Sequence, residues 1–411
     1  MPRRVVVTGM GIVSPLGNHP EDFFAALIAG HSGIGRLQSS FTEKLDTRIA
    51  AQCGFDAATH FTKRQADSLD RVSQFALSAA RQAIQDAGLA MASLPKSRIG
   101  VSLGTGMGGS ASTEEGYTRL LVEGATRLKP FTVLMAMNNA AASHIALEYG
   151  ITGPNFTYST ACSSSAIAIG EACEKIRHGH ADVMLAGGAE ALLTYGTLKA
   201  WEALRTLAKE DVDDAAASCK PFSLDRTGLV LGEGAGMLVL EDMDAARARG
   251  ARIYAEVTGY GCTNDASHIT QPSVEGQAMA MQAALTDAQL TPAELGYINA
   301  HGTGTLLNDA TETAAIKQVM GERAYAIPVS STKSMHGHLM GAAGAVEFIA
   351  CIKVLEKNAM PPTAHLHTPD PACDLDYIPN VARNAVQLDH VLSNSFAFGG
   401  TCGVLIASRL P

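Results

Sequence analysis

The sequence predicts an α/β fold built from two similar halves. Short runs of β-branched residues alternate with alanine-rich helical stretches along the whole chain, which is typical of buried sheets covered by helices. Segments 83–89 and 284–290 are similar, and each precedes a candidate strand that ends in Gly-Thr-Gly, at 104–106 and 302–304. Such a repeat indicates two related α/β units that face each other, with an active site between them.

Several segments carry the strand pattern, and three longer segments carry a clear helical pattern. Strands are expected at 4–8, 99–103, 156–159, 183–186, 236–241, 253–260, 297–299, 327–330 and 403–408. Helices are expected at 70–87, 163–178 and 341–356. No linker rich in proline, serine or charge separates the halves, and the acidic segment 209–214 is expected to be a solvated loop.

The composition narrows the class of protein. Of the 411 residues, 46% are hydrophobic, which excludes a disordered chain. Asp and Glu number 40 against 31 Lys and Arg, giving a net charge of −9, so neither nucleic acid nor a membrane is an expected partner. No long apolar run and no signal-peptide pattern is present. The eight cysteines form no C-x-x-C pair, which favours free thiols, and we expect a cytoplasmic enzyme.

Two glycine-rich motifs are expected to be coincidental. Residues 104–109 match G-x-G-x-x-G, a dinucleotide-binding pattern that requires a helix immediately afterwards. Residues 110–117 are polar and show no apolar face at helical spacing, so neither a helix nor a nucleotide site is expected there. Ser102 lies in a G-x-S-x-G match, but within a predicted strand instead of at a strand-to-helix turn.

Cys162 is the first candidate for catalysis. It lies between a predicted strand that ends near residue 159 and the helix expected over 163–178. At a helix N-terminus the unpaired backbone N–H groups and the helix dipole favour a thiolate. The alternative is a buried structural cysteine, which is the usual environment of this residue.

Two histidines lie at comparable strand ends. His301 follows the predicted strand 297–299, and His338 lies between the predicted strand 327–330 and the helix 341–356. In open α/β sheets, catalytic groups gather at such positions. A metal site formed by His336 and His338 is an alternative, but Glu347 is the sole acidic candidate ligand nearby.

Several motifs together resemble those of the β-ketoacyl-acyl-carrier-protein synthases, the elongating ketosynthases of the thiolase superfamily. They lie at 160–165, 182–190, 232–236, 299–305, 331–347 and 394–400, and the resemblance extends over the whole chain. It implies the thiolase-like duplicated five-layered αβαβα sandwich. An N-terminal half, 1–250, would carry the nucleophile, and a C-terminal half, 251–411, would carry both histidines and a gating loop. Family members are homodimers or heterodimers of like subunits.

The resemblance also implies a decarboxylative Claisen condensation. Cys162 would take an acyl group from the phosphopantetheine arm of an acyl carrier protein, and malonyl-carrier protein would then lose CO2. His301 and His338 would donate hydrogen bonds to the enolate, and Lys333 would orient this region electrostatically. The N–H groups of Cys162 and Phe398 would form the oxyanion hole. No cofactor and no catalytic metal is expected.

Other positions match supporting parts of the family site. Asn299, Glu347 and Ser393 match residues that organise the second histidine and, in some members, bind a structural alkali cation. An ordinary helix ion pair of Glu347 with Lys353 is the alternative. Phe398 would be the gate, with Gly399 and Gly400 as its hinge. Three positions depart from the family pattern and put the gate and site in question: Ala397, Cys402 and His336.

Substrate and carrier contacts are expected at two further groups of residues. The acyl pocket would be lined by Met107, Thr132, Thr197 and Trp201, whose indole would favour short or flat acyl groups. The acidic carrier protein would dock on Lys63, Arg64, Arg127 and Arg205. His336 is expected to be dispensable, because His338 is the histidine that matches the family position.

Other functions remain open at this stage. Within the ketosynthases, type II fatty acid synthesis competes with a polyene or polyketide pathway. A non-catalytic chain-length partner subunit would lack the nucleophile, which this chain retains as Cys162. A thiolase would need a second catalytic cysteine, and Cys402 is the sole candidate near the C-terminal loop.

Overall fold

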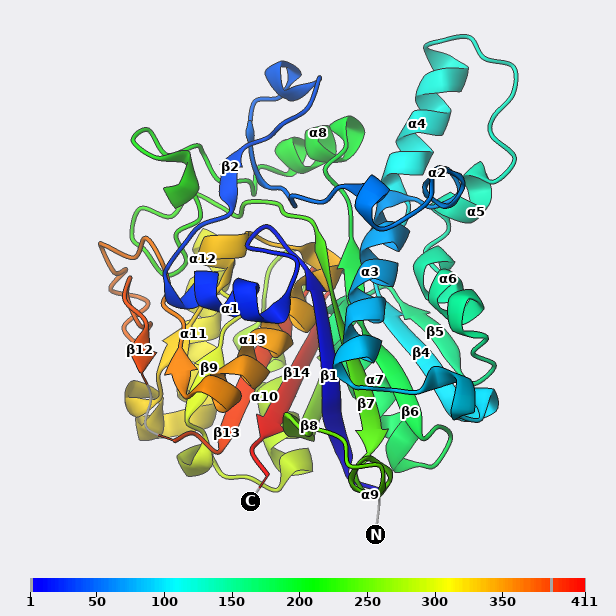
Figure 1. Cartoon of the computed structure of the whole chain (residues 1–411). Coiled ribbons are helices and arrows are strands. Elements are labelled where there is room, and N and C mark those ends of the chain that lie inside the picture. Colours follow the sequence, from blue (N-terminus) through cyan, green and yellow to red (C-terminus); the bar gives the residue numbers. More distant parts are fainter. Residues whose placement is uncertain (1–2, 385–386, 411) are drawn as a thin grey trace.

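The computed structural model describes residues 3–384 and 387–410 (Figure 1). The strands are β1 (Val5–Val13), β2 (Ile34–Arg36), β3 (Ile49–Ala51), β4 (Ile99–Gly104), β5 (Asn155–Tyr158), β6 (Val183–Glu190), β7 (Gly234–Asp242), β8 (Ala255–Asn264), β9 (Tyr297–Asn299), β10 (Val329–Ser330), β11 (Ala359–Met360), β12 (Arg383–Asn384), β13 (His390–Phe396) and β14 (Thr401–Ser408). The α-helices are α1 (Pro20–Ile28), α2 (Lys63–Ala66), α3 (Arg71–Asp86), α4 (Ser110–Leu121), α5 (Thr132–Ala136), α6 (Ala140–Tyr149), α7 (Ser164–Arg177), α8 (Tyr195–Leu204), α9 (Met243–Ala248), α10 (Val274–Ala288), α11 (Leu306–Met320), α12 (Lys333–His336) and α13 (Ala343–Lys357).

The principal sheet consists of two halves with the same strand pattern. Its order is β10-β9-β13-β14-β8-β1-β7-β6-β4-β5, and a short antiparallel pairing of β1 with β8 joins the halves. In the first half β5, β4 and β6 are parallel, and β7 and β1 follow antiparallel. In the second half β10, β9 and β13 are parallel, and β14 and β8 follow antiparallel. The predicted duplication is therefore confirmed.

The helices complete five layers. α3 and α6 cover the outer face of the first half, and α10, with α11 beside it, covers the outer face of the second (Figure 1). α7 and α13 lie between the halves, where α7 contacts β4 and β6 and α13 contacts β7 and β13. Every residue from Ala343 to Leu355 in α13 is buried, because sheets cover both of its sides. The predicted αβαβα sandwich is confirmed.

Close helix-to-strand packing is repeated in the two halves. A Cβ on Gly11 of β1 would lie 2.0 Å from the carbonyl oxygen of Ala79 in α3. A Cβ on Gly261 of β8 would lie 2.1 Å from the carbonyl oxygen of Ala280 in α10. Glycine is required at both positions because the helix backbone occupies the space of a side chain. The same contact thus fixes the outer helix of each half.

Two local predictions were wrong. Residues 110–117 begin α4, whose buried positions are the small residues Ser110, Ser112 and Gly116, so the helix packs without the apolar stripe sought in the sequence. The resemblance placed the gating loop over residues 394–401, but residues 394–396 complete β13 and Thr401 begins β14. Among the described residues, no helix is long and apolar enough to cross a membrane.

Candidate active site

Cys162 lies in a tight turn between β5 and α7. It belongs to a short 3-10 turn, Ala161–Ser163, which Ala161 enters with a φ of +50°. The side chain is buried, and Ser163, Ser164 and Ser165 behind it are buried as well. A similar turn precedes α13, where Met340 has a φ of +46° and follows His338 closely. Cys162 therefore lies within the turn before α7, and His338 lies two residues before the corresponding turn of α13.

His301 presents Nε2 as its hydrogen-bond donor. The Lys333 ammonium donates to the His301 carbonyl oxygen at 2.6 Å and lies 3.3 Å from Nδ1 of the same residue. An ammonium carries donors only, so Nδ1 accepts and the ring proton lies on Nε2. The backbone N–H groups of His301 and Gly302 donate to the Glu312 carboxylate, each at 2.8 Å.

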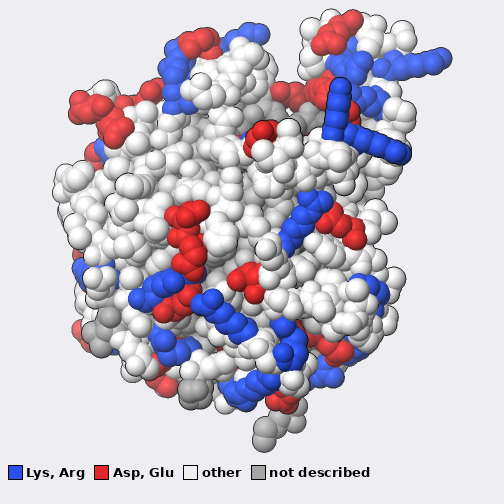
Figure 2. Space-filling view, in the orientation of Figure 1, with Lys and Arg blue, Asp and Glu red and all other residues white. Residues whose placement is uncertain are grey.

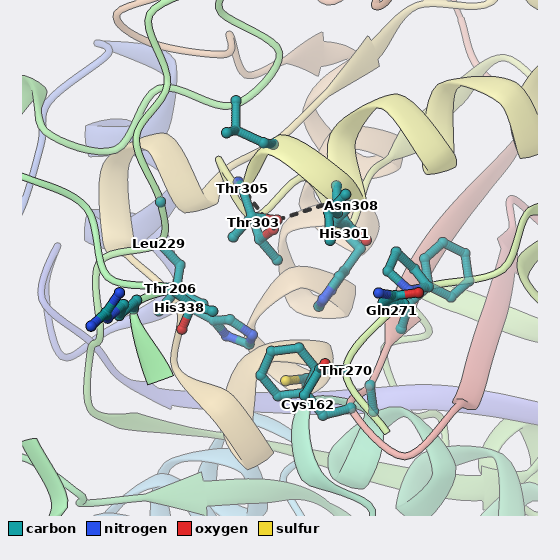
Figure 3. Close-up of a pocket in the computed structure, with 18 of the residues that line it drawn as sticks. Cys162, Thr206, Leu229, Thr270, Gln271, His301, Thr303, Thr305, Asn308 and His338 are labelled. Carbon is teal, nitrogen blue, oxygen red and sulfur yellow. Dashed lines mark hydrogen bonds between the residues drawn. The ribbon is translucent and has the colours of Figure 1, made fainter. Parts of the chain in front are cut away.

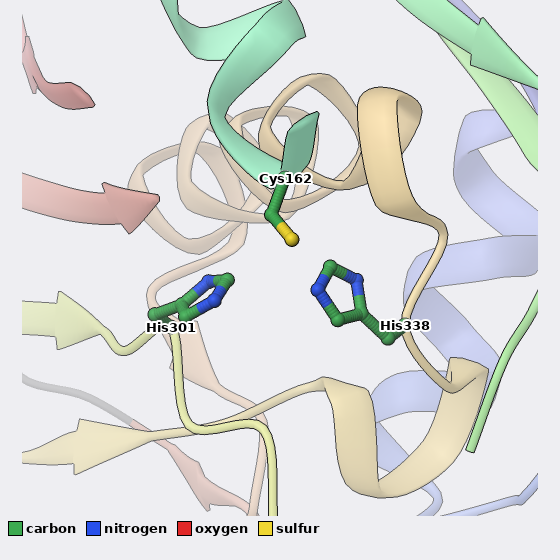
Figure 4. A group of neighbouring side chains, drawn as sticks. All are labelled: Cys162, His301 and His338. Atoms are coloured by element: carbon green, nitrogen blue, oxygen red, sulfur yellow. The ribbon is translucent and has the colours of Figure 1, made fainter. Parts of the chain in front are cut away.

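His338 has the same tautomer for a different reason. The backbone N–H of Met340 donates to Nδ1 of His338 at 3.1 Å, which leaves the proton on Nε2. That Nε2 is buried and has no hydrogen-bond partner among the described residues. The rings of His301 and His338 stand edge to face, with centroids 5.4 Å apart, and both turn toward the sulfur of Cys162 (Figure 4).

The two histidines are neutral donors. Burial, and then the positive charge of Lys333, lowers the pKa of both His301 and His338 well below the ordinary value. The potential ligand atoms of Cys162, His301 and His338 lie within 4.8 Å of one another, close enough to hold a metal. The assigned tautomers put a proton on the Nε2 of each histidine, which favours hydrogen-bond donation over metal ligation. His336 does not join His338 in a metal site, because both of its ring nitrogens contact Thr332 and Gly337.

The ionisation of Cys162 differs from the sequence-based expectation. Burial raises the pKa of the thiol to about 12, whereas the charge of Lys333 and the backbone N–H groups of Phe398 and Cys162 act in the opposite direction. Burial therefore opposes the thiolate that the helix N-terminus favours. The backbone N–H groups of Phe398 and Cys162, expected to form the oxyanion hole, act in favour of the thiolate.

Lys333 and Glu347 form a buried ion pair. The Lys333 ammonium lies 2.5 Å from Oε1 of Glu347, and both side chains are fully buried. Lys353, the alternative partner of Glu347, pairs instead with Glu21 at 2.6 Å and with Glu356. The alternative, an ordinary helix ion pair of Glu347 with Lys353, was therefore wrong.

A cavity of about 220 Å³ leads to these groups (Figure 3). Cys162, His301 and His338 line it, as do Trp201 and Arg205 among the residues proposed from sequence. Phe396 at the end of β13 lines it too, as do Ala397 and Phe398 of the predicted gating loop. Met107, Thr132 and Thr197 are not among its lining residues, so their place in an acyl pocket stays a prediction.

The predicted gating loop lies against a second loop. The N–H of Gly399 donates to the carbonyl oxygen of Ile269 at 2.8 Å, and the N–H of Asp265 donates to that of Gly400 at 3.0 Å. Gly399 and Gly400 have φ values of +86° and +84°, which favour glycine. The hinge assignment itself stays a prediction.

Four basic residues proposed for carrier docking lie on two parts of the molecule. Lys63 and Arg64 are exposed on α2, and Arg127 is exposed in the connection between α4 and α5. Figure 2 shows basic side chains gathered over these elements at its upper right. Arg205 ends α8 and lines the cavity of Cys162.

Two buried carboxylates near the site were missed from sequence. Glu190 accepts hydrogen bonds from the N–H groups of Gly106, Met107 and Gly341, and burial raises its pKa to about 7. These bonds occupy the glycine-rich motif that resembles a nucleotide-binding loop, so a phosphate would find no free N–H at Gly106 or Met107. Glu312 holds the loop of His301. Their sequence signal is weak: each is an acid within an otherwise buried segment.

The comparisons with known proteins decide the family. The family model described as "Beta-ketoacyl synthase, N-terminal domain" matches residues 2–246, and the one described as "Beta-ketoacyl synthase, C-terminal domain" matches residues 254–367. The chain belongs to the beta-ketoacyl synthase family. This confirms the resemblance drawn from the motifs, and the chain is an enzyme of this family.

Relatives of this beta-ketoacyl synthase align over nearly their whole length. Nodulation protein E of Rhizobium meliloti is 46% identical over 98% of this chain and 99% of its own. A 3-oxoacyl-[acyl-carrier-protein] synthase 2 of Staphylococcus aureus is 42% identical over 99% of this chain and 98% of its own. Among solved structures, the ishigamide ketosynthase/chain length factor has a TM-score of 0.94 at 36% identity and covers 100% of both chains.

Proposed function

We propose that this beta-ketoacyl synthase condenses an acyl group held on Cys162 with the malonyl group of a malonyl-acyl carrier protein. One observation carries the assignment of roles. A buried thiol and two Nε2–H donors of neutral histidines converge at the end of a single cavity. A nucleophile next to paired neutral donors suits a reaction that first forms a thioester and then an enolate.

In the first half-reaction Cys162 exchanges thioesters. Its sulfur loses the thiol proton and attacks the acyl carbonyl carbon, and the carrier's phosphopantetheine sulfur leaves and takes up a proton. The N–H groups of Cys162 and Phe398 stabilise the oxyanion between these steps. Because burial raises the pKa of the thiol to about 12, the approach of the thioester and the nearby charge of Lys333 must assist deprotonation.

In the second half-reaction the malonyl group loses CO2. The carbon–carbon bond to the carboxylate breaks, and its electron pair forms an enolate whose oxygen accepts from His301 and His338. The enolate carbon then attacks the acyl carbon on Cys162, and the Cys162 sulfur leaves and regains a proton. The product is a β-ketoacyl-carrier protein. Neutral imidazoles suit this step because they donate without first having to be charged.

The proposed partners are an acyl carrier protein and a second, like subunit. The surface beside β5 suits the second subunit. β5 is the edge strand of the first half, and its Phe156 side chain is 47% exposed. Exposed apolar side chains of the neighbouring α4, α5 and α6 regions are Tyr117, Leu121, Val122, Phe131, Val133, Leu134, Met137 and Leu147. An edge strand beside such a surface suits pairing with a like subunit. Met107 and Thr132 belong to this region, so a second subunit would complete an acyl pocket there.

The site needs no cofactor for these steps, and three buried oxygens could serve as ligands of one structural cation. Oδ1 of Asn299, Oε2 of Glu347 and Oγ of Ser393 are buried without hydrogen-bond partners among the described residues. Oxygens of this kind are the ligands that an alkali cation takes, and these residues would hold it beside the Lys333–Glu347 pair. Phosphopantetheine reaches the site as part of the carrier substrate.

The pathway and setting are proposed on narrower grounds. Type II fatty acid synthesis and a related polyene or polyketide pathway use the same condensation, and Trp201 in the cavity favours short or flat acyl groups. We propose a cytoplasmic enzyme.

Cys402 is buried, its thiol faces the carbonyl oxygen of Gly400, and it does not line the cavity, which argues against a thiolase.

Two Cys162 variants test the roles. Purified C162A is expected to gain no acyl mass from an acyl-carrier protein, whereas C162Q should lose condensation yet still decarboxylate malonyl-carrier protein. Cys262→Ala, at an exposed thiol, is the control and should load normally. Acyl loading on C162A would overturn the nucleophile. In the C162Q background, His301→Ala or His338→Ala should abolish decarboxylation, and its persistence in both would overturn the enolate site.

A further inference from the structure

We propose that His336 is a positioning residue that orients His338 by holding the peptide group between Gly337 and His338. The inference rests on the proposed function of His338 and on contacts that the resemblance to other ketosynthases does not supply. His336 is fully buried at the end of α12, and both of its ring nitrogens are in hydrogen-bond contact. A buried polar side chain with a partner at each ring nitrogen, two residues from the enolate donor, indicates a specific role. This proposal therefore replaces the expectation that His336 is dispensable.

The contacts assign the tautomer of His336. Its Nδ1 lies 2.8 Å from the carbonyl oxygen of Gly337, which can only accept, so Nδ1 carries the proton. Its Nε2, 2.9 Å from Oγ1 of Thr332, must then accept from the threonine hydroxyl. The oxygen of Thr332 in turn accepts from Nδ2 of Asn299 at 3.4 Å. The three hydrogen bonds therefore run in one direction: Asn299 donates to Thr332, Thr332 donates to His336, and His336 donates to Gly337.

The peptide group between Gly337 and His338 is fixed at both of its polar atoms. His336 holds its carbonyl oxygen, and its N–H donates to the carbonyl oxygen of Val230 at 2.7 Å. Gly337 has a φ of +68°, and a Cβ there would lie 2.8 Å from the Cβ of Ala51. Glycine adopts this conformation without strain, and the imidazole is one of the two hydrogen-bond partners that fix the peptide group.

The orientation of this peptide group decides where Nε2 of His338 points. The carbonyl oxygen of His338 accepts from Gly232 at 2.9 Å, and its Nδ1 accepts from Met340 at 3.1 Å. A rotation of the preceding peptide group would move the ring relative to Cys162. A displacement of about 1 Å in a reacting group can lower a rate about 100-fold. Burial also lowers the pKa of His336 to about 3, so Nε2 of the imidazole stays unprotonated at neutral pH and can accept from Thr332.

Variants at position 336 test the inference in the C162Q background. His336→Met fills the space without a donor and is expected to lower the decarboxylation rate about 100-fold without a matching change in KM. His336→Asn keeps an N–H near the position of Nδ1 and should restore most of the rate. Acyl loading of Cys162, measured with the native cysteine, should be unchanged in both. His390→Asn is the matched control, because it changes another hydrogen-bonded histidine, whose Nδ1 lies 2.7 Å from Oγ of Ser408.

A coupling measurement adds the second partner. Thr332→Val removes the donor to Nε2, and the double variant with His336→Met should decarboxylate no more slowly than His336→Met alone. Solid-state 15N NMR of histidine-labelled protein should show the Nδ1–H tautomer for His336, which tests the assignment even where His336→Met does not fold.

Three results would overturn the inference. They are an Nε2–H tautomer at His336, a decarboxylation rate in His336→Met equal to that of His390→Asn, and equal losses of acyl loading and decarboxylation. Failure of C162Q itself to decarboxylate would count against the proposed function instead, because that protein retains His336.

Discussion

Trp201 stacks on Phe398, with ring centroids 6.0 Å apart and ring planes 24° from parallel. Trp201 belongs to α8, and Phe398 belongs to the predicted gating loop beyond β13. The indole therefore contacts the residue that must move if the loop opens. Trp201 affects both the width of the cavity and the freedom of the gate, and the sequence indicated only the first of these roles.

Truncating Trp201 should ease acyl loading. A stacked aromatic pair contributes about 0.5–1.5 kcal/mol beyond its buried area, so its loss should favour opening by about 2- to 10-fold. Trp201→Ala is expected to load long saturated acyl groups faster than wild type, measured by intact mass against a short acyl group. Tyr195→Ala is the control, because Tyr195 lies on the same helix, packs on Phe41 and does not line the cavity. Equal loading of sixteen-carbon chains by wild type and variant would contradict this prediction.

Lys333 should influence stability and activity separately. Lys333→Met leaves Glu347 buried without its partner, which is expected to lower the free energy of unfolding by about 3–5 kcal/mol. The double variant Lys333→Met with Glu347→Leu should recover most of that stability in urea denaturation. Decarboxylation should stay low in both, because Nδ1 of His301 loses its donor. Recovery of decarboxylation in the double variant would limit Lys333 to a structural role.

The two adjacent glycines of the gating loop offer a matched comparison. A Cβ on Gly400 would lie 2.3 Å from Oδ1 of Asp265, whereas a Cβ on Gly399 would meet nothing within 4 Å. Both positions have positive φ, so alanine at either should cost about 1–2 kcal/mol of backbone strain. Only Gly400→Ala must also displace the neighbouring loop, and we expect slower acyl loading in that variant. Identical loading rates in the two variants would argue against a coupled movement of the loops.

His336 should make the protein sensitive to acid. Its folded-state pKa is about 3, against an ordinary value of 6.5. Above pH 6.5 the imidazole of His336 is neutral in both the folded and the unfolded protein. Below pH 6.5 the unfolded chain takes up a proton that the folded protein excludes, so the free energy of unfolding decreases as the pH is lowered. Between pH 7 and pH 5 wild type should lose about 2 kcal/mol more than His336→Asn in urea denaturation at fixed protein concentration. Equal losses would show that His336 titrates normally.

The strand and helix patterns and the repeat were sufficient for an α/β fold of two similar halves. The motifs were sufficient for the family and, through it, for the five-layered sandwich. Cys162, His301 and His338 could be proposed from sequence because each follows a strand, which is a local property, and the structure brings the three side chains together. α4 could not be found in this way, because it buries serines and a glycine instead of an apolar stripe. The start of the predicted gating loop was misplaced because β13 continues into it.

Contacts between distant segments account for the remaining differences. Glu190 and Glu312 hold backbone N–H groups of loops, and no spacing in the sequence records which loops meet them. The partner of Glu347 lies on another element, so the nearby Lys353 misled the local interpretation. The raised pKa of Cys162 follows from burial by the whole fold, which a helix N-terminus in the sequence does not reveal.

The turns before α7 and α13 lie in different halves of the chain, and this separation also bears on the order in which the protein folds. Cys162 comes from one half of the sheet and both histidines from the other, so the site depends on contacts between parts far apart in the sequence. Such contacts form late, because long loops must close before they are made. A nascent chain with only its first half folded would have a thiol but no enolate donors. Catalytic competence should therefore appear in the last phase of refolding, after most of the helical signal has returned.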